Sequence, residues 1–149
     1  MPQTFTQLHY HLVFSTRHRE PMLTPQIRER VWDYLGGIIR SEGGISIRVG
    51  GTADHVHLLA TLHQNQSLAV FMRKLKANSS GWAHETFPES RVWWQTGYGA
   101  FTVSHSAVDA VRNYIENQEQ HHREMSFQDE FRGLLKRHGI QYDERYLWD

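Results

Sequence analysis

The sequence predicts an α+β protein built on a ferredoxin-like (RRM-like) antiparallel sheet, with helices on one face and additional C-terminal helices. Three observations predict this class. Strand and helix patterns alternate in the order strand–helix–strand–strand–helix–strand. Two more helical patterns follow that unit. The chain has 149 residues, of which 39% are hydrophobic, a size and composition that fit one domain over residues 1–149.

Period-two alternation of apolar and polar residues marks the strands. Leu8, Tyr10, Leu12 and Phe14 give the first example. A hairpin is expected where the pair Gly50-Gly51 separates two such segments. Glycines inside the last segment predict a bend or bulge. The expected strands cover residues 8–14, 45–49, 55–62 and 92–103.

Capping residues mark where the helices begin. Thr24 precedes a proline suited to the first helical position, and Ser67 precedes an apolar helical pattern. Ser106 and Ser126 each precede an aspartate by three residues, which resembles a capping box. The expected helices run from 25 to the glycines at 43–44, from 67 to before Pro88, from 106 to 122 and from 126 to Gly139. The aromatic tail, 141–149, is expected to pack on the domain.

Composition narrows the classes of function. The absence of cysteine excludes disulfides and thiolate metal sites. We expect no signal peptide, because no basic segment precedes an apolar run near the N-terminus. No apolar stretch reaches the ~20 residues of a membrane span. We therefore expect a cytoplasmic protein that has no membrane partner.

The charge distribution leaves room for a nucleic-acid partner. Sixteen basic and sixteen acidic residues give a net charge of zero, whereas nucleic-acid-binding proteins are usually basic. Residues 1–108 nevertheless carry ten bases and seven acids, and no acid lies between His55 and His84. Eleven histidines and five tryptophans are also present. Imidazole binds metals and indole stacks on unpaired bases, although most tryptophans are expected in the core.

Two histidines on the third expected strand form a candidate metal site. In the segment Asp54-His55-Val56-His57, residues two apart point to the same face of a strand. His55 and His57 therefore project together, as two nitrogen ligands of one divalent metal would. The pattern alone also fits two half-buried histidines that neighbouring groups satisfy.

A tyrosine on the third expected helix forms the second candidate. Ala107, Ala110, Val111, Tyr114 and Ile115 follow the spacing of one helical face, which then continues through Gln118 and His122. A tyrosine on such a face is often a packing residue. The polar end of the face is hard to explain as core, and it predicts that this end of the helix lies over a polar site.

These residues resemble the single-tyrosine HUH transposases of small bacterial insertion sequences, including the REP-associated tyrosine transposases. His55-Val56-His57, preceded by Asp54, matches the HUH motif. Tyr114, Asn117 and Gln118 match the family's Y-x-x-N-Q helix. Three further segments resemble the family: residues 10–14 followed by Arg17 and Arg19, residues 94–98, and residues 146–148. The resemblance covers nearly the whole chain.

The resemblance implies a mechanism and its site residues. His55 and His57 would hold Mg²⁺ or Mn²⁺, and Gln118 would complete the metal site. Tyr114 would attack DNA and form a 5′-phosphotyrosine. From the residues themselves, His122 is a rival to Gln118, because imidazole binds transition metals better than an amide does, and zinc remains open.

The resemblance also implies the partners, which are single-stranded DNA hairpins at the ends of the element and a second copy of the chain. Bound to DNA, the protein is expected at the nucleoid. The tyrosine helix can act on its own histidines or on those of the second copy, and exchange between the copies is slightly favoured. An open sheet edge favours a homodimer on physical grounds as well. Basic residues near the first strand and on the second helix are candidates for phosphate contacts. These residues are Arg17, Arg19, Arg73, Lys74 and Lys76.

Three other functions fit parts of the sequence. A domesticated family member would process chromosomal repeat hairpins without moving an element of its own. A non-catalytic RRM-like module would bind RNA, and it would need exposed aromatic residues on the first and third strands. A two-histidine metal hydrolase would need no tyrosine. The sequence favours the DNA transposase, because histidines occupy the third strand and a tyrosine motif follows.

Overall fold

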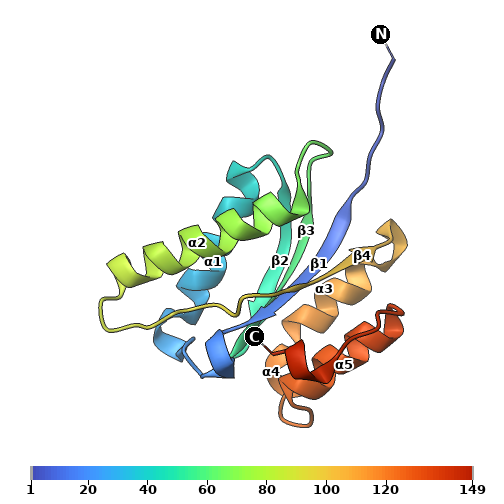
Figure 1. Cartoon of the computed structure of the whole chain (residues 1–149). Helices are drawn as coiled ribbons and strands as arrows, with labels where there is room; N and C mark the ends of the chain where they lie inside the picture. Colours follow the sequence, from blue (N-terminus) through green and yellow to red (C-terminus); the bar gives the residue numbers. More distant parts are fainter. Residues whose placement is uncertain (1, 149) are drawn as a thin grey trace.

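The computed structural model describes residues 2–148 and contains one four-stranded antiparallel sheet. The strands lie in the order β2-β3-β1-β4, which is the ferredoxin-like arrangement expected from the sequence. Figure 1 shows the sheet between two groups of helices. The strands are β1 (His9–Ser15), β2 (Ile45–Gly51), β3 (His55–Thr61) and β4 (Gly99–Val103).

Two long helices, α1 (Pro25–Ser41) and α2 (Leu68–Thr86), cover one face of the sheet. Alternation along the strands sends Leu12, Phe14 and Val56 into this layer, where their side chains are fully buried. The predicted cap of α2 is confirmed, because the Ser67 hydroxyl accepts a hydrogen bond from the Val70 N–H. This layer holds the largest part of the core.

The C-terminal helices cover the opposite face. They are α3 (Val108–Glu116), α4 (Gln118–His121) and α5 (Phe127–Arg137). Val13 of β1 and Phe101 of β4 pack against the apolar face of α5, and Leu59 of β3 packs against α3. The predicted start of α5 is confirmed by the hydrogen bond from the Asp129 N–H to the Ser126 hydroxyl. Both faces of the sheet are therefore buried by helices.

The expected third helix, 106–122, is wrong in two respects. Ser106 does not cap it, because its hydroxyl is hydrogen-bonded to that of Ser104, and a short 3-10 turn precedes Val108. The helix also breaks at Asn117, whose φ and ψ of −98° and 20° are not helical. The break separates α3 from α4 and reorients the chain between Tyr114 and Gln118.

The expected fourth strand, 92–103, is also wrong over its first half. β4 begins only at Gly99, and before it a single bridge joins Trp94 to Thr16. Main-chain groups in this segment bond elsewhere. The carbonyls of residues 95–97 accept from the Lys76 ammonium group, whereas the bond from the Arg17 N–H to the Trp93 carbonyl belongs to the single bridge. A ladder with β1 would need some of these groups.

The pair Gly50-Gly51 is not the hairpin turn that the sequence predicted. Both glycines belong to β2 and pair with β3, and the chain reverses after them at residues 52–54. Gly50 has a packing role, because a Cβ there would lie 2.9 Å from a side-chain carbon of Ile115. The missing side chain lets α3 lie close to the sheet.

The C-terminal tail packs on α5, as expected for most of its residues. Tyr142, Leu147 and Trp148 contact the apolar cluster beneath α5, whereas Tyr146 is largely exposed. Gly139 ends the helix with a φ of +67°. Among the described residues, no helix has the length and apolar character needed to cross a membrane.

Candidate active site and metal centre

His55 and His57 lie side by side on β3 and face the C-terminal helices. Both side chains are fully buried, while Val56 between them points into the core on the opposite face. A carboxylate can only accept hydrogen bonds, so the 2.8 Å contact orients His55 with its Nδ1–H donating to Asp54. This contact directs His55 Nε2 into the space beneath α4 and α5.

His57 is held from two sides. Its Nδ1 lies 2.7 Å from Nε2 of His11, and its Nε2 lies 3.1 Å from a carboxylate oxygen of Glu130. His11 comes from β1 and is itself buried. Burial and the neighbouring His57 lower the pKa of His11 to about 3, so the His11 ring is neutral at ordinary pH.

Glu130 on α5 is the centre of the cluster, and the sequence analysis missed it. Its side chain is 1% exposed. It accepts hydrogen bonds from His122 Nε2 at 2.9 Å, from Gln118 Nε2 at 2.9 Å and from the hydroxyl of Tyr114. Burial by itself raises the pKa of a carboxyl group, but hydrogen bonds from His122 and His57 outweigh it and lower the pKa of Glu130. A buried carboxylate results.

A sequence signal for Glu130 did exist. Phe127, Phe131 and Leu134 form the buried stripe of α5, and Glu130 occupies a position on the same stripe. An acid on an otherwise apolar helix face is seldom buried without partners. The capping signal at Ser126 involves Asp129, the residue before Glu130, and no sequence motif assigned a role to Glu130 itself.

Tyr114 points from α3 into the same cluster. Its hydroxyl donates to Glu130, and its ring lies 5.8 Å from the ring of His57. Burial and the Glu130 carboxylate raise the pKa of Tyr114, so the phenol keeps its proton in the resting site. The sequence analysis predicted only that the polar end of this helix lies over a polar site, and the structure places Tyr114 beside the two histidines of its own chain.

Both candidates for the remaining metal ligand reach the cluster. Gln118 is 1% exposed, and its Oε1 lies 2.9 Å from His55 Nε2. His122 Nε2 lies 3.0 Å from the same Gln118 oxygen. The break at Asn117 allows both side chains to face inward.

The donor set fits a divalent cation. Ligand atoms from His55, His57, His122 and Glu130 all lie within 4.8 Å of one another. Three imidazoles and a carboxylate, with an amide oxygen beside them, suit divalent transition metals, among which is Mn²⁺. The second partners of His55 and His57, which are Asp54 and His11, orient the rings as is common around metal ions.

The basic candidates for DNA contact lie away from this cluster. Arg17 stacks over Trp93 at 5.2 Å, and Arg19 stacks over Trp148 at 5.1 Å. In this turn His18 has a φ of 55° and Arg19 a φ of 57°, an uncommon and costly backbone conformation. The turn at residues 17–19 therefore presents its basic side chains beside two tryptophans.

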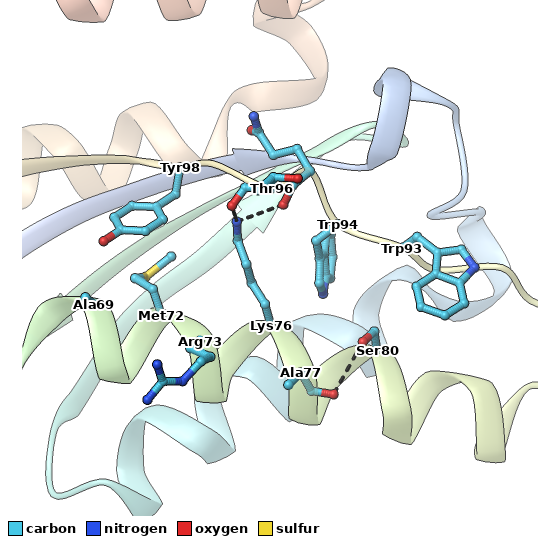
Figure 2. Close-up of a pocket in the computed structure, with 11 residues that line it drawn as sticks. Ala69, Met72, Arg73, Lys76, Ala77, Ser80, Trp93, Trp94, Thr96 and Tyr98 are labelled. Carbon is cyan, nitrogen blue, oxygen red and sulfur yellow. Dashed lines mark hydrogen bonds between the residues drawn. The ribbon is translucent and has the colours of Figure 1, made fainter. Parts of the chain in front are cut away.

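The second helix gives a mixed result. Lys76 faces inward, and its ammonium group donates to the main-chain carbonyls of Gln95, Thr96 and Gly97. Figure 2 shows Lys76 extending from α2 toward Thr96. Burial lowers the pKa of Lys76 to about 8. Lys74 lies 3.4 Å from a Glu42 oxygen, and Arg73 is exposed. Lys76 therefore holds the 95–97 segment on α2 instead of facing solvent.

Arg73 borders a groove of about 360 Å³ between α2 and the 93–98 segment. Trp94 and Tyr98 form its two aromatic walls in Figure 2, and Lys76 and Met72 lie between them. Trp94 is 7% exposed and belongs to the core, as expected for most tryptophans, whereas Trp93 is 43% exposed.

Comparison with known proteins relates this chain to transposases. The sequence profile of the family described as "Transposase IS200 like" matches residues 4–118. The ISDra2 transposase TnpA of Deinococcus radiodurans is 29% identical over 118 residues, which cover 75% of this chain and 84% of that protein. The IS200 transposase of Salmonella typhimurium is 27% identical over 115 residues, which cover 73% of this chain and 75% of that protein.

Solved structures agree in fold. A structure of a proposed transposase from Deinococcus radiodurans has a TM-score of 0.65 and 26% identity, covering 79% of this chain and 95% of that one. A REP-associated tyrosine transposase bound to a REP hairpin has a TM-score of 0.58 and 13% identity. That match covers 82% of this chain and 73% of the other.

A ferredoxin-like sheet with a His-x-His pair on its third strand and a tyrosine helix above it defines a single-tyrosine HUH transposase. The profile match over residues 4–118 shows that the chain belongs to the IS200-like transposase family, and its function is that of a DNA transposase. Glu130 lies beyond the matched range.

Proposed function

We propose that this transposase cuts and rejoins single-stranded DNA through a covalent bond to Tyr114, with His55 and His57 holding a divalent metal. The observation that carries the proposal is the convergence of the Tyr114 hydroxyl, the two histidines and Gln118 on one buried carboxylate, Glu130. A nucleophile, metal ligands and a proton acceptor are thus within contact distance of one another.

The chemistry follows from these positions. The Tyr114 oxygen attacks the scissile phosphorus, and the bond from phosphorus to the 3′ oxygen breaks. The products are a 5′-phosphotyrosine and a 3′ hydroxyl, which takes up a proton as it leaves. Glu130 accepts the hydrogen bond of the phenol and is placed to receive its proton. Rejoining is the reverse attack by a 3′ hydroxyl on the phosphotyrosine, and it needs no ATP.

The metal site comprises His55, His57, Glu130 and one of two further groups. We assign the remaining position to Gln118, with His122 as its rival, because both reach the cluster. What a divalent cation supplies in such a site is polarisation of the phosphate and compensation of the negative charge that develops in the transition state. The mixed oxygen and nitrogen ligands favour Mn²⁺, with Mg²⁺ as the other physiological choice.

We place the DNA contacts on Arg17, Arg19, Arg73 and Lys74. The first two extend from the strained turn, beside the exposed Trp93 and the half-buried Trp148, and Arg73 borders the aromatic groove. Hairpin DNA is the proposed substrate, in line with the REP hairpin bound by the structural relative. The work would take place in the cytoplasm, where the chain meets such DNA.

A homodimer is the proposed working unit. β2 and β4 form open edges of the sheet, and Ile45 on β2 is 62% exposed. Two copies would also hold two DNA ends together. Tyr114 reaches its own histidines within one chain, so an exchange of helices between subunits is not required. Light scattering with and without hairpin DNA measures the assembly.

The RNA-binding alternative is disfavoured by the packing. An RRM-like platform needs exposed aromatic residues on β1 and β3. On the face opposite α1 and α2, these strands carry histidines, Val13 and Leu59, which lie beneath α3–α5. A domesticated family member would have this same site, and the neighbourhood of its gene would distinguish it from a mobile one.

The test is incubation of a hairpin oligonucleotide carrying a single-stranded cleavage site with the protein and Mn²⁺. We expect a protein–DNA adduct that survives denaturation, together with a free 3′-hydroxyl fragment. Chelation with EDTA should abolish both products. A fully duplex oligonucleotide of the same sequence is the control substrate, because Tyr114 acts on single-stranded DNA in this proposal.

A further inference from the structure

A cavity of about 380 Å³ lies beside Tyr114, between α3, α5 and β4. Tyr114 forms part of its wall, and so does His11, which is hydrogen-bonded to His57. The cavity therefore reaches the proposed nucleophile and the partner of a proposed metal ligand from the β4 side. Its volume falls within the range typical of small-ligand sites.

The remaining lining has two chemical parts. Phe101 and His138 stack on each other with ring centroids 4.4 Å apart, and both rings border the cavity. Phe101 is 3% exposed, so His138 is the accessible ring of the pair, and the small side chain of Ala110 on α3 also lines the cavity. Arg137 supplies a positive charge, and no acidic residue is among the described residues that line the cavity. A planar aromatic surface next to a cation suits a base attached to a phosphate.

The other parts of the site are closed. His55 and His57 are fully buried, and Glu130 is 2% exposed. Tyr114 is only half-buried, and Arg137 and Ala110 are exposed. The cavity thus joins solvent to the nucleophile, while the metal-binding cluster lies behind it.

We propose that this cavity receives one unpaired nucleotide of single-stranded DNA, next to the scissile phosphate. Its base lies against the Phe101–His138 pair and its phosphate near Arg137. The inference rests on the proposed function of Tyr114. It explains a preference for single strands, because a paired base can enter such a cavity only after unstacking and unpairing, which costs a few kcal/mol.

The test scans the oligonucleotide with abasic sites and measures binding. All proteins carry Tyr114→Phe, so no covalent bond forms and fluorescence anisotropy reports equilibrium affinity. We expect one abasic position beside the scissile phosphate to weaken binding about tenfold, which is the size of effect produced by one lost base stack. Abasic sites elsewhere in the unpaired segment should have smaller effects.

Ala110→Trp tests whether that base enters the cavity. An indole at this lining position takes up space in the cavity, so the intact and abasic oligonucleotides should bind this variant with affinities equal within twofold. Asn113→Trp, on the exposed side of the same helix, is the matched control and should keep the tenfold difference. Ala110→Leu repeats the test if the indole disturbs folding, because leucine is smaller than tryptophan and is a good helix former.

Arg137→Ala tests the phosphate contact. It should weaken both oligonucleotides alike and reduce the slope of affinity against salt by about one unit. Arg123→Ala is the control, because Arg123 is exposed and does not border the cavity.

If the abasic effect persists in full in Ala110→Trp and Ala110→Leu, the cavity does not hold the base and the proposal is overturned. This outcome differs from a failure of the proposed function. If wild-type protein forms no adduct at Tyr114, the proposed function is contradicted. If the adduct forms but the Ala110 variants keep the abasic effect, only the proposed role of the cavity is contradicted.

Discussion

Two contacts, one between His55 and Asp54 and one between His57 and His11, set the direction of the histidine lone pairs at the centre of the site. His55 donates to Asp54 through Nδ1, which leaves Nε2 facing the cluster. His57 has no carboxylate behind it and contacts His11 instead. When Nε2 of His57 binds a cation, its Nδ1–H needs an acceptor, and neutral His11 offers one at Nε2.

The role of His11 leads to a first prediction. His11→Ala should weaken Mn²⁺ binding by roughly 10–100-fold, the range seen when a residue behind a metal ligand is removed. Isothermal titration of the protein with Mn²⁺ measures this directly. His9→Ala is a matched control, because His9 is also buried on β1 but contacts Thr61 and His105. Equal affinities for Mn²⁺ in the two variants would show that His11 does not support the metal site.

The choice between Gln118 and His122 as the remaining metal ligand gives a second prediction. Gln118→Ala should weaken the Mn²⁺ dependence of cleavage more than His122→Ala does. Gln118 is almost fully buried and bridges His55 to Glu130, whereas His122 also bonds to the carbonyl of Met125. A titration of adduct yield against Mn²⁺ measures the ranking, and the reverse order would assign the position to His122.

Among the elements, the sequence predicted those whose apolar pattern and caps agree. β1, β3, α1, α2 and α5 lie close to their expected ranges, because their buried faces repeat at the period of the element. The 92–98 segment does not form the expected strand. Val92 and Trp94 pack in the core, and the carbonyl of Gln95 accepts a hydrogen bond from Lys76, which lies 19 residues earlier in the sequence. Tertiary contacts of this kind leave no local pattern.

The site was predictable to a similar degree. His55 and His57 follow a motif within one strand, Tyr114 and Gln118 follow a motif of five residues, and the structure brings all four together. Glu130 comes from a helix beyond the family match, and its role depends on how α5 packs on the sheet. The break at Asn117, which turns both Gln118 and His122 inward, has no glycine or proline to mark it.

Lys76 provides a third prediction, at the scale of the element that it holds. Lys76→Met should lower the free energy of unfolding by about 1–3 kcal/mol, because it leaves main-chain carbonyls of residues 95–97 without a donor. Urea unfolding measures the change. Arg73→Ala, three residues earlier and exposed, should leave stability within about 0.5 kcal/mol. A Lys76→Met protein as stable as the parent would contradict the structural role.

For the molecule as a whole, the metal-free cluster predicts acid sensitivity. Burial lowers the pKa of His11 to about 3 and that of His57 to about 4, whereas both titrate near 6.5 when unfolded. Between those values the unfolded chain binds more protons, so stability falls as pH decreases below 6.5. The lowered pKa of Glu130 adds to this loss as the pH approaches 4.5, whereas the raised pKa of His122 opposes it near pH 6.5, because His122 is more protonated in the folded state than in the unfolded chain.

Urea unfolding in EDTA at pH 7 and at pH 5 measures this fourth prediction. The free energy of unfolding should fall by about 2–4 kcal/mol, since each such histidine contributes up to about 1.4 kcal/mol per pH unit. His11→Asn should remove roughly half of the slope. Stability that stays constant or rises toward pH 5 would mean that these histidines are not buried in their neutral form.

The central claim is that Tyr114 becomes covalently linked to DNA. The most direct measurement is mass spectrometry of the denatured, protease-digested product of a reaction with hairpin DNA and Mn²⁺. We predict a 5′-phosphonucleotide on the peptide that contains Tyr114, and no adduct from a Tyr114→Phe protein that still binds the hairpin. A nucleotide attached to another residue, such as Tyr98 or Tyr10, or wild-type adduct yield from Tyr114→Phe, would contradict the account.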